Sequence, residues 1–200
     1  MNRNLLIKIT LAGIGLCLLL IVGSFFTGPP RNTPGKLWQR YNPSGNFTLT
    51  EATGKPFHLE DLRGKVVLLF FGYTSCPDAC PSTLAKLQRA FRMLTKEQIA
   101  QVRTVFISVD PKRDTPKLLK DYVDYFGVNA IGLTGSKADI DKVVDAYQAH
   151  YLEIPGETGH WYSINHTTTV YLHDKQGKVR YLFLYEETPE RLAEEIRKRL

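Results

Sequence analysis

Apolar residues form three kinds of pattern along this chain. Residues 9–26 are uncharged and almost entirely apolar. Two shorter apolar runs, 65–71 and 102–109, have the length of strands that are buried on both faces of a sheet. Elsewhere, apolar residues recur three and four positions apart, which predicts helices with one buried face.

The remaining pattern predicts strands and helices in alternation. Alternating residues at 46–50, followed by a turn and then Phe57 and Leu59, predict a short hairpin. The other predicted strands are 130–133, 167–173 and 178–184. The predicted helices begin near the two prolines at 77 and 81 and run to about Leu94, cover 115–126 and 136–149, and start again at Thr188-Pro189. This order predicts an α/β domain with a mixed sheet flanked by helices, and the terminal hairpin and helix favour a thioredoxin-like arrangement.

The apolar run at 9–26 predicts a membrane-spanning helix. At 1.5 Å per residue it is about 27 Å long, close to the hydrocarbon thickness of about 30 Å. A cleaved signal peptide is the alternative, but its apolar stretch is shorter and ends in small residues, which this run lacks. The predicted organisation is therefore a cytoplasmic tail at 1–8, a transmembrane anchor at 9–26, a Pro- and Gly-rich linker at 27–45 and a thioredoxin-like domain at 46–200.

Composition and charge narrow the functional classes. The chain has 200 residues, of which 43% are hydrophobic and 23% charged, values typical of one globular domain and not of a disordered chain. Five basic residues and no acidic ones precede Glu51, so they account for most of the net charge of +6. The domain itself is nearly neutral, which disfavours a nucleic-acid partner. Three cysteines exclude a disulfide-dense scaffold.

The candidate chemistry lies in FGYTSCPDACP at 71–81. Cys76 and Cys80 follow the most apolar predicted strand and open a helix, where the helix dipole lowers a thiol pKa. Their spacing brings both sulfurs to one side of a turn, close enough for a disulfide or one metal ion. Two buried, inert cysteines are the alternative, and the surrounding prolines, which mark a shaped loop, disfavour it.

The ligand inventory favours copper over zinc. A structural zinc site takes four ligands, and this chain offers one cysteine pair. Two thiolates with one imidazole suit Cu(I). The histidines available as a third ligand are His58, His150, His160, His166 and His173. We favour His166, because it directly precedes the predicted strand 167–172, where the chain of a thioredoxin-like fold faces the cysteine loop; His58 and His150 are expected in solvent.

Three segments together resemble one protein family. FGYTSCPDACP at 71–81, SVDPKRDTP at 108–116 and NHTTTVYLHD at 165–174 are similar to the Sco (SenC) family of copper chaperones, and the resemblance covers nearly the whole chain. It implies a thioredoxin-like fold that binds copper, as Cu(I) and also as Cu(II), through Cys76, Cys80 and His166. It further implies that Asp78 and Asp110 lie around these ligands.

The resemblance also implies a function in assembling the dinuclear copper centre of cytochrome c oxidase. We expect a membrane-anchored copper chaperone, not an enzyme, that delivers copper to the copper-receiving subunit of the oxidase. The alternative is a thiol-disulfide reductase that uses Cys76 and Cys80 to keep the oxidase cysteines reduced. Besides the oxidase subunit, we expect the protein to have a thiol reductant or another copper carrier as a partner. The expected location is the bacterial inner membrane with the domain in the periplasm, and the mitochondrial inner membrane is the alternative.

Two features disfavour general disulfide exchange. Three residues separate Cys76 from Cys80, whereas thioredoxin oxidoreductases place two between their cysteines. Those enzymes also carry a cis-proline before the strand that faces the cysteines, and this chain has no proline between Pro155 and Pro189. A peroxiredoxin-like peroxidase is disfavoured as well, because Thr74 is one residue too close to Cys76 for a Thr-x-x-Cys loop.

Overall fold

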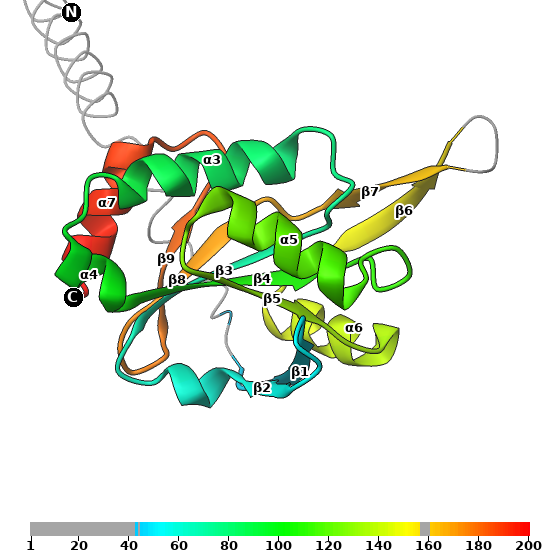
Figure 1. The fold of residues 1–200 in the computed structure, drawn as a ribbon, viewed down its shortest axis with the longest axis horizontal. Coiled ribbons are helices and arrows are strands. Elements are labelled where there is room, and N and C mark those ends of the chain that lie inside the picture. The colour runs from blue at the N-terminus through cyan, green and yellow to red at the C-terminus, as the bar shows by residue number, and fades with distance from the viewer. Residues whose placement is uncertain (1–42, 44, 157–160) are drawn as a thin grey trace, which may run out of the picture. The chain divides into compact units, whose positions relative to one another are not determined.

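The structure, a computed structural model, describes residues 43, 45–156 and 161–200. A seven-stranded mixed sheet forms its centre. The strand order is β2-β1-β5-β4-β3-β8-β9 (Figure 1). The strands are β1 (Thr48–Glu51), β2 (Pro56–His58), β3 (Val66–Gly72), β4 (Val102–Ser108), β5 (Ala130–Thr134), β8 (Val170–His173) and β9 (Val179–Phe183). β4 runs parallel to β3 and β5, and the other neighbours are antiparallel. The predicted mixed sheet is confirmed.

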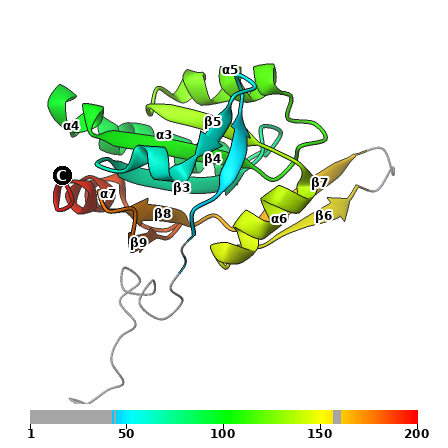
Figure 2. The ribbon, with the colours of Figure 1, turned by 90° about the horizontal axis from the view of Figure 1, so that it is seen from below.

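Helices cover both faces of this sheet. They are the 3-10 helix η2 (Leu59–Leu62) and the α-helices α3 (Ala79–Phe91), α4 (Lys96–Ala100), α5 (Pro116–Phe126), α6 (Lys137–Ala146) and α7 (Pro189–Arg197). α3 and α5 lie on one side of the sheet and α6 on the other (Figures 1 and 2). All seven residues of β3 are buried, as expected for a central strand between two helical layers.

The predicted helix starts are confirmed by their caps. The side chains of Thr115, Ser136 and Thr188 each accept a hydrogen bond from a backbone N–H in the first turn of α5, α6 and α7. Gly127 ends α5 with a φ of 59°, a left-handed conformation that glycine adopts without strain.

Two predicted helices are shorter in the structure. The first ends at Phe91, not near Leu94, and α4 follows as a separate helix. The predicted helix 136–149 ends at Ala146. Tyr147, the residue after this helix, is buried, and its hydroxyl lies 2.9 Å from His173 Nε2. The next residue, Gln148, has a φ of 50°, a left-handed conformation that cannot continue the helix.

A hairpin outside the main sheet was not predicted. β6 (Tyr151–Pro155) and β7 (Tyr162–His166) form a two-stranded antiparallel sheet that projects from one end of the molecule (Figure 1). The predicted strand 167–173 is present as β8 but begins three residues later, at Val170. His166, expected directly before that strand, instead ends β7.

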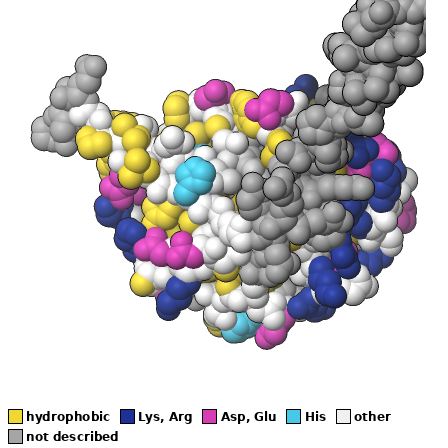
Figure 3. All heavy atoms as spheres, turned by 180° about the vertical axis from the view of Figure 1, so that it is seen from behind, with side chains coloured by type: hydrophobic (Ala, Val, Ile, Leu, Met, Phe, Trp, Pro, Cys, Tyr) yellow, Lys and Arg dark blue, Asp and Glu magenta, His cyan; other side chains and the backbone are white. Residues whose placement is uncertain are grey.

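The hairpin has one face toward the protein and one toward solvent. Ile164 and His166 are buried, whereas Leu152 and Ile154 on the opposite face are 63% and 41% exposed. Exposed apolar side chains gather at the outer end of the hairpin (Figure 3), where Trp161 is 70% exposed. Side chains of a strand alternate between its faces, so this pattern follows from the pleat.

No helix in the described part of the chain has the length and apolar character needed to cross a membrane. The predicted tail at 1–8, anchor at 9–26 and nearly all of the linker at 27–45 lie outside the described residues. These boundaries therefore stay predictions.

Candidate metal centre

The two cysteines lie where the central strand β3 passes into α3. Cys76 is in the connecting loop and half-buried, and Cys80 is in the first turn of α3 and completely buried. The backbone N–H of Cys80 donates to Cys76 Sγ over 3.4 Å. At Gly72 a Cβ atom would lie 2.8 Å from Cys80 Sγ, so the absence of a side chain there makes room for this sulfur.

His166 reaches the cysteines from the end of β7. Its Nε2 lies 3.2 Å from Cys80 Sγ and 3.9 Å from Cys76 Sγ. Its Nδ1 lies 3.0 Å from the carbonyl oxygen of Thr167, which can only accept a hydrogen bond. Nδ1 therefore donates to this oxygen, and Nε2 faces the two sulfurs.

Aromatic rings hold the imidazole in this orientation. The ring of Tyr73 meets the His166 ring edge-on with centroids 5.7 Å apart, and the ring of Phe70 does so at 6.1 Å. Both aromatic residues are almost completely buried. The imidazole is thus packed on rigid neighbours before any ligand binds.

The two thiols differ strongly in acidity. A hydrogen bond from the Cys80 thiol, supported by His166 and by the N–H groups of Cys80 and Asp78, lowers the pKa of Cys76 to about 3. Burial, together with the neighbouring Cys76 sulfur, raises the pKa of Cys80. At neutral pH the pair consequently holds one negative charge, on the sulfur that is open to solvent.

The structure brings together three of the residues singled out from the sequence. The donor atoms of Cys76, Cys80 and His166 all lie within 4.8 Å of one another, and no second such group occurs among the described residues. The other histidines lie elsewhere. His58 is bonded to Thr48, His150 is exposed, His173 is buried beside Tyr147, and His160 is outside the described residues.

The two predicted carboxylates take different places. Asp78 is exposed just before α3, and its carboxylate accepts a hydrogen bond from Ser82 Oγ over 3.0 Å. Asp110 is buried, pairs with the Arg113 guanidinium and accepts a hydrogen bond of 2.8 Å from the Tyr162 hydroxyl. Neither carboxylate belongs to the donor group in the described residues.

A second buried carboxylate near the site escaped the sequence analysis. Asp114 is 1% exposed and accepts hydrogen bonds from the Thr74 N–H at 3.1 Å, the Thr74 hydroxyl at 2.6 Å and the Ser108 hydroxyl at 2.6 Å. Burial raises its pKa despite these donors. Its position in SVDPKRDTP was the available signal, but an Asp before Thr-Pro is also typical of an ordinary helix start.

Two of the three donor residues, Cys76 and His166, line a pocket of about 280 Å³ between the cysteine loop and the hairpin, whereas Cys80 is buried behind them. Pro77, Ile154 and Asn165 are among the other residues of its walls. A second molecule can therefore approach the half-buried Cys76 sulfur from solvent.

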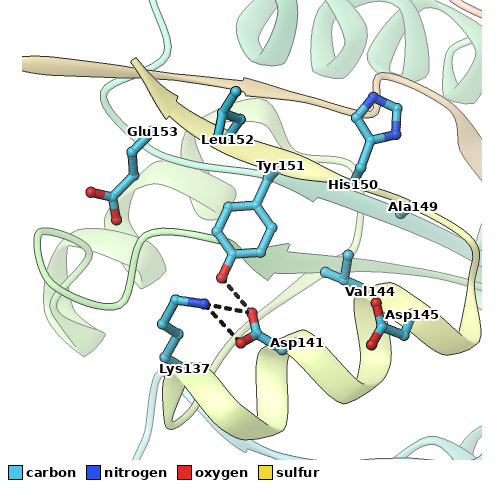
Figure 4. A pocket seen from close by; sticks show the side chains of 9 residues that line it. All are labelled: Lys137, Asp141, Val144, Asp145, Ala149, His150, Tyr151, Leu152 and Glu153. Atoms are coloured by element: carbon cyan, nitrogen blue, oxygen red, sulfur yellow. Dashed lines mark hydrogen bonds and ion pairs between the residues drawn. The ribbon is translucent and has the colours of Figure 1, made fainter. Parts of the chain in front are cut away.

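A larger pocket, of about 490 Å³, lies between α6 and β6 and has no cysteine in its lining (Figure 4). Its polar groups bond one another. Asp141 forms an ion pair of 2.7 Å with Lys137 and accepts a hydrogen bond of 2.6 Å from the Tyr151 hydroxyl (Figure 4). We assign no ligand to it.

The chain is similar to proteins of known family. It is 34% identical over 196 residues to an SCO2-like protein of Rickettsia prowazekii, covering 94% of this chain and 95% of the relative. It matches the structure of Bradyrhizobium japonicum ScoI with copper bound at 37% identity and a TM-score of 0.71, covering 78% of this chain and 99% of that one.

A third similarity concerns BsSco, described as a member of the Sco family of cytochrome c oxidase assembly proteins in which a disulfide switch was identified. The identity is 27% and the TM-score 0.59, over 78% of this chain and 92% of that one. The family model described as SCO1/SenC matches residues 36–200. The three segments that resemble Sco proteins thus lie within a full-length match, and this chain belongs to the SCO1/SenC family.

Proposed function

We propose that this protein binds one copper ion on Cys76, Cys80 and His166 and delivers it to the copper-receiving subunit of a cytochrome c oxidase. The observation that carries the proposal is the cluster of two sulfurs and one imidazole nitrogen within 4.8 Å, of which Cys76 and His166 line an open pocket. The copper-bound ScoI structure of B. japonicum supports it by similarity.

The donor set fits a soft, low-coordinate ion. Two thiolates and one imidazole suit Cu(I) better than the harder ions that oxygen ligands select. With bonds of about 2.0–2.3 Å, three ligands around one ion lie roughly 3.8 Å apart. The Cys76–His166 separation of 3.9 Å already matches this value, and the Cys80–His166 separation of 3.2 Å needs only a small outward shift.

The site also suits an ion that the protein carries and then transfers to another protein. A structural metal is enclosed by four ligands, whereas here the group has three donors, and two of them, Cys76 and His166, line a pocket that leads to solvent. A thiolate of the receiving protein can thus approach the ion at Cys76, while Cys80 and His166 hold it from the buried side. Because Cys80 is protonated in the free protein, copper binding releases its proton.

One observation favours the second candidate function, a thiol-disulfide reductase. A half-exposed Cys76 thiolate beside a buried Cys80 thiol is the arrangement needed to reduce a partner disulfide. Cys76 would attack one sulfur of the partner disulfide and release the other as a thiolate. Cys80 would then lose its proton, attack Cys76 Sγ and release the partner sulfur bound there, so that two electrons pass to the partner and a Cys76–Cys80 disulfide remains. The disulfide switch described for BsSco supports this alternative.

We also propose the location. The uncharged run at 9–26 would anchor the protein in a bacterial inner membrane, with 1–8 in the cytoplasm and the copper-binding domain in the periplasm. A mitochondrial inner membrane is the alternative location. In either case the domain would lie on the side of the membrane where the oxidase receives copper.

The test of copper binding is an anaerobic titration of the reduced protein with Cu(I), followed by X-ray absorption spectroscopy. We expect one equivalent per chain, coordinated by two sulfurs and one nitrogen. Replacing Cys76 by Ser should abolish this spectrum. Binding without sulfur ligands, or no binding, would overturn the proposal.

Oxidase assembly in cells separates the two functions. The variant H166A retains both cysteines and hence the reductase chemistry. At low external copper it should fail to assemble the oxidase if the protein carries copper. Normal assembly by H166A together with failure of C76S would establish the reductase function instead.

A further inference from the structure

A chain of hydrogen bonds joins the cysteine loop to the strand of His166 through the loop that follows β4. This loop carries two buried carboxylates, Asp110 and Asp114, which are 2% and 1% exposed. Ser108 connects them. Its hydroxyl donates to Asp114 over 2.6 Å and accepts the backbone N–H of Asp110 over 3.0 Å. Ser108 therefore joins Asp110 and Asp114 into one hydrogen-bonded unit, through the backbone of Asp110 and the carboxylate of Asp114.

At one end of this unit, Asp110 and Arg113 hold β7, the strand that ends in His166. Asp110 accepts a hydrogen bond of 2.8 Å from the Tyr162 hydroxyl and pairs with Arg113. The Arg113 guanidinium donates to the Tyr162 carbonyl oxygen over 2.8 Å and stacks 3.7 Å above the centre of the Tyr162 ring. Both the main chain and the side chain of Tyr162, the first residue of β7, are thus fixed.

The same strand is fixed again two residues later. The Ile164 N–H donates to the Tyr73 hydroxyl over 3.1 Å, and the Tyr73 ring packs against His166. Within the described residues, β7 has no strand partner other than β6. These side-chain contacts consequently replace the backbone ladder that would otherwise hold β7 against the main sheet.

The other end of the unit holds the cysteine loop. Asp114 accepts two hydrogen bonds from Thr74, which lies two residues before Cys76. Four residues of the loop therefore connect Thr74 in the cysteine loop with Tyr162 at the start of β7: Ser108, Asp110, Arg113 and Asp114.

We propose that Asp110, Arg113 and Tyr162 are positioning residues that hold His166 at its distance from the two cysteine sulfurs, with Asp114 fixing the cysteine loop from the opposite end. This inference rests on the proposed copper site. A donor set held in place before binding loses less conformational freedom when the ion arrives, and so binds it more tightly.

The test is Tyr162→Phe, which removes the hydroxyl bonded to Asp110 and keeps the ring on which Arg113 stacks. We expect Cu(I) affinity to fall by about tenfold, the lower end of what is typical when a group that orients a metal ligand is lost. X-ray absorption should show a weaker nitrogen contribution at unchanged sulfur content. In the reduced, copper-free protein the Ile164 and His166 amides should exchange hydrogen about tenfold faster, without a change in the melting temperature.

The matched control is Tyr151→Phe. Tyr151 lies opposite His166 in the same hairpin, and its hydroxyl donates to Asp141 over 2.6 Å, so the substitution removes an equivalent bond outside the proposed network. It should leave affinity and spectrum unchanged. Equal losses in both variants, or none in Tyr162→Phe, would overturn the inference while leaving the copper site intact. Failure of the unaltered protein to bind copper through nitrogen and sulfur would instead overturn the proposed function.

Discussion

The Nε2 atom of His166 lies 3.2 Å from the Sγ atom of Cys80, although 86 positions separate the two residues in the chain. One comes from the first turn of a helix that follows the central strand, and the other from the end of a hairpin outside the main sheet. Neither element alone makes a site. The fold makes one by placing the helix start and the hairpin end at the same edge.

Replacing His166 by Ala should weaken Cu(I) binding by more than about 100-fold, the upper end for a group that only orients a ligand, because the ion keeps two sulfurs and loses its nitrogen ligand itself. Competition with a chromophoric Cu(I) chelator measures this change. His150→Ala is the control, since His150 is exposed and outside the donor cluster. Equal effects of the two substitutions would contradict the assignment of His166.

The two thiols should differ in their reaction with an alkylating reagent. The pKa of Cys76 is about 3, so this residue is a thiolate throughout the range from pH 5 to 8, whereas Cys80 is buried and protonated. Iodoacetamide should modify Cys76 at pH 5 far faster than it modifies a free cysteine, whose pKa is about 8.5. Mass spectrometry of the peptides identifies the modified residue. A rate at Cys76 that rises tenfold per pH unit up to pH 8 would contradict the prediction.

His173 should make stability depend on pH. Burial lowers its pKa to about 4, below the unfolded value of about 6.5. Between these values the unfolded chain binds a proton that the folded protein does not, so the free energy of unfolding falls as the pH falls from 6.5 to 4. The full loss is about 3 kcal/mol.

Urea denaturation at several pH values measures this effect. In His173→Gln the free energy of unfolding should fall less steeply over the same range. His58→Gln, a change at a half-buried histidine bonded to Thr48, should keep the slope of the unaltered protein. An unchanged slope in His173→Gln would assign the pH dependence to other groups.

Gly72→Ala should disturb the site by crowding. The new methyl group would lie 2.8 Å from Cys80 Sγ and equally close to the Phe106 ring, which must both move. We expect a loss of about 1–3 kcal/mol of stability and weaker Cu(I) binding. Gly132→Ala is the matched control, because its methyl group would crowd Leu119 at 2.7 Å, away from the cysteines. That variant should lose stability and keep its copper affinity; a parallel loss of affinity would show a general effect of destabilisation.

The anchor predicted at 9–26 should retain the full-length protein in the membrane after a carbonate wash. Protease added to spheroplasts should digest the domain and spare a cytoplasmic marker. Recovery of a soluble periplasmic form that lacks the first 24–28 residues would identify the run as a cleaved signal peptide.

Sequence reasoning located the cysteine pair because its geometry is local. A buried strand, a proline-bounded loop and a helix start follow one another along the chain, so the place of Cys76 and Cys80 follows from the order of elements. The confirmed helix starts at Thr115 and Thr188 are local in the same way. His166 was selected through its expected place opposite the loop, although the strand that it ends, β7, was not predicted.

The hairpin and the carboxylate network could not be predicted for the opposite reason. In β6 the exposed residues include Leu152 and Ile154, so the polarity pattern does not show which face is buried. Asp110 and Asp114 are buried only because partners from distant segments, such as Tyr162 and Thr74, satisfy their oxygens. Such partners belong to the tertiary structure and leave no periodic signal in the sequence.

The separation of β6–β7 from the main sheet gives the site a mechanical property. An ion held by Cys76, Cys80 and His166 would connect the cysteine loop with the β6–β7 hairpin. In the described part of the chain this hairpin and the main sheet share no backbone hydrogen-bond ladder. Coupling between binding events is reciprocal. If ion binding stabilises the position of the hairpin, then a partner that binds the hairpin in a displaced position must weaken ion binding by the same free energy. Such a partner would release the ion without contacting the three ligands.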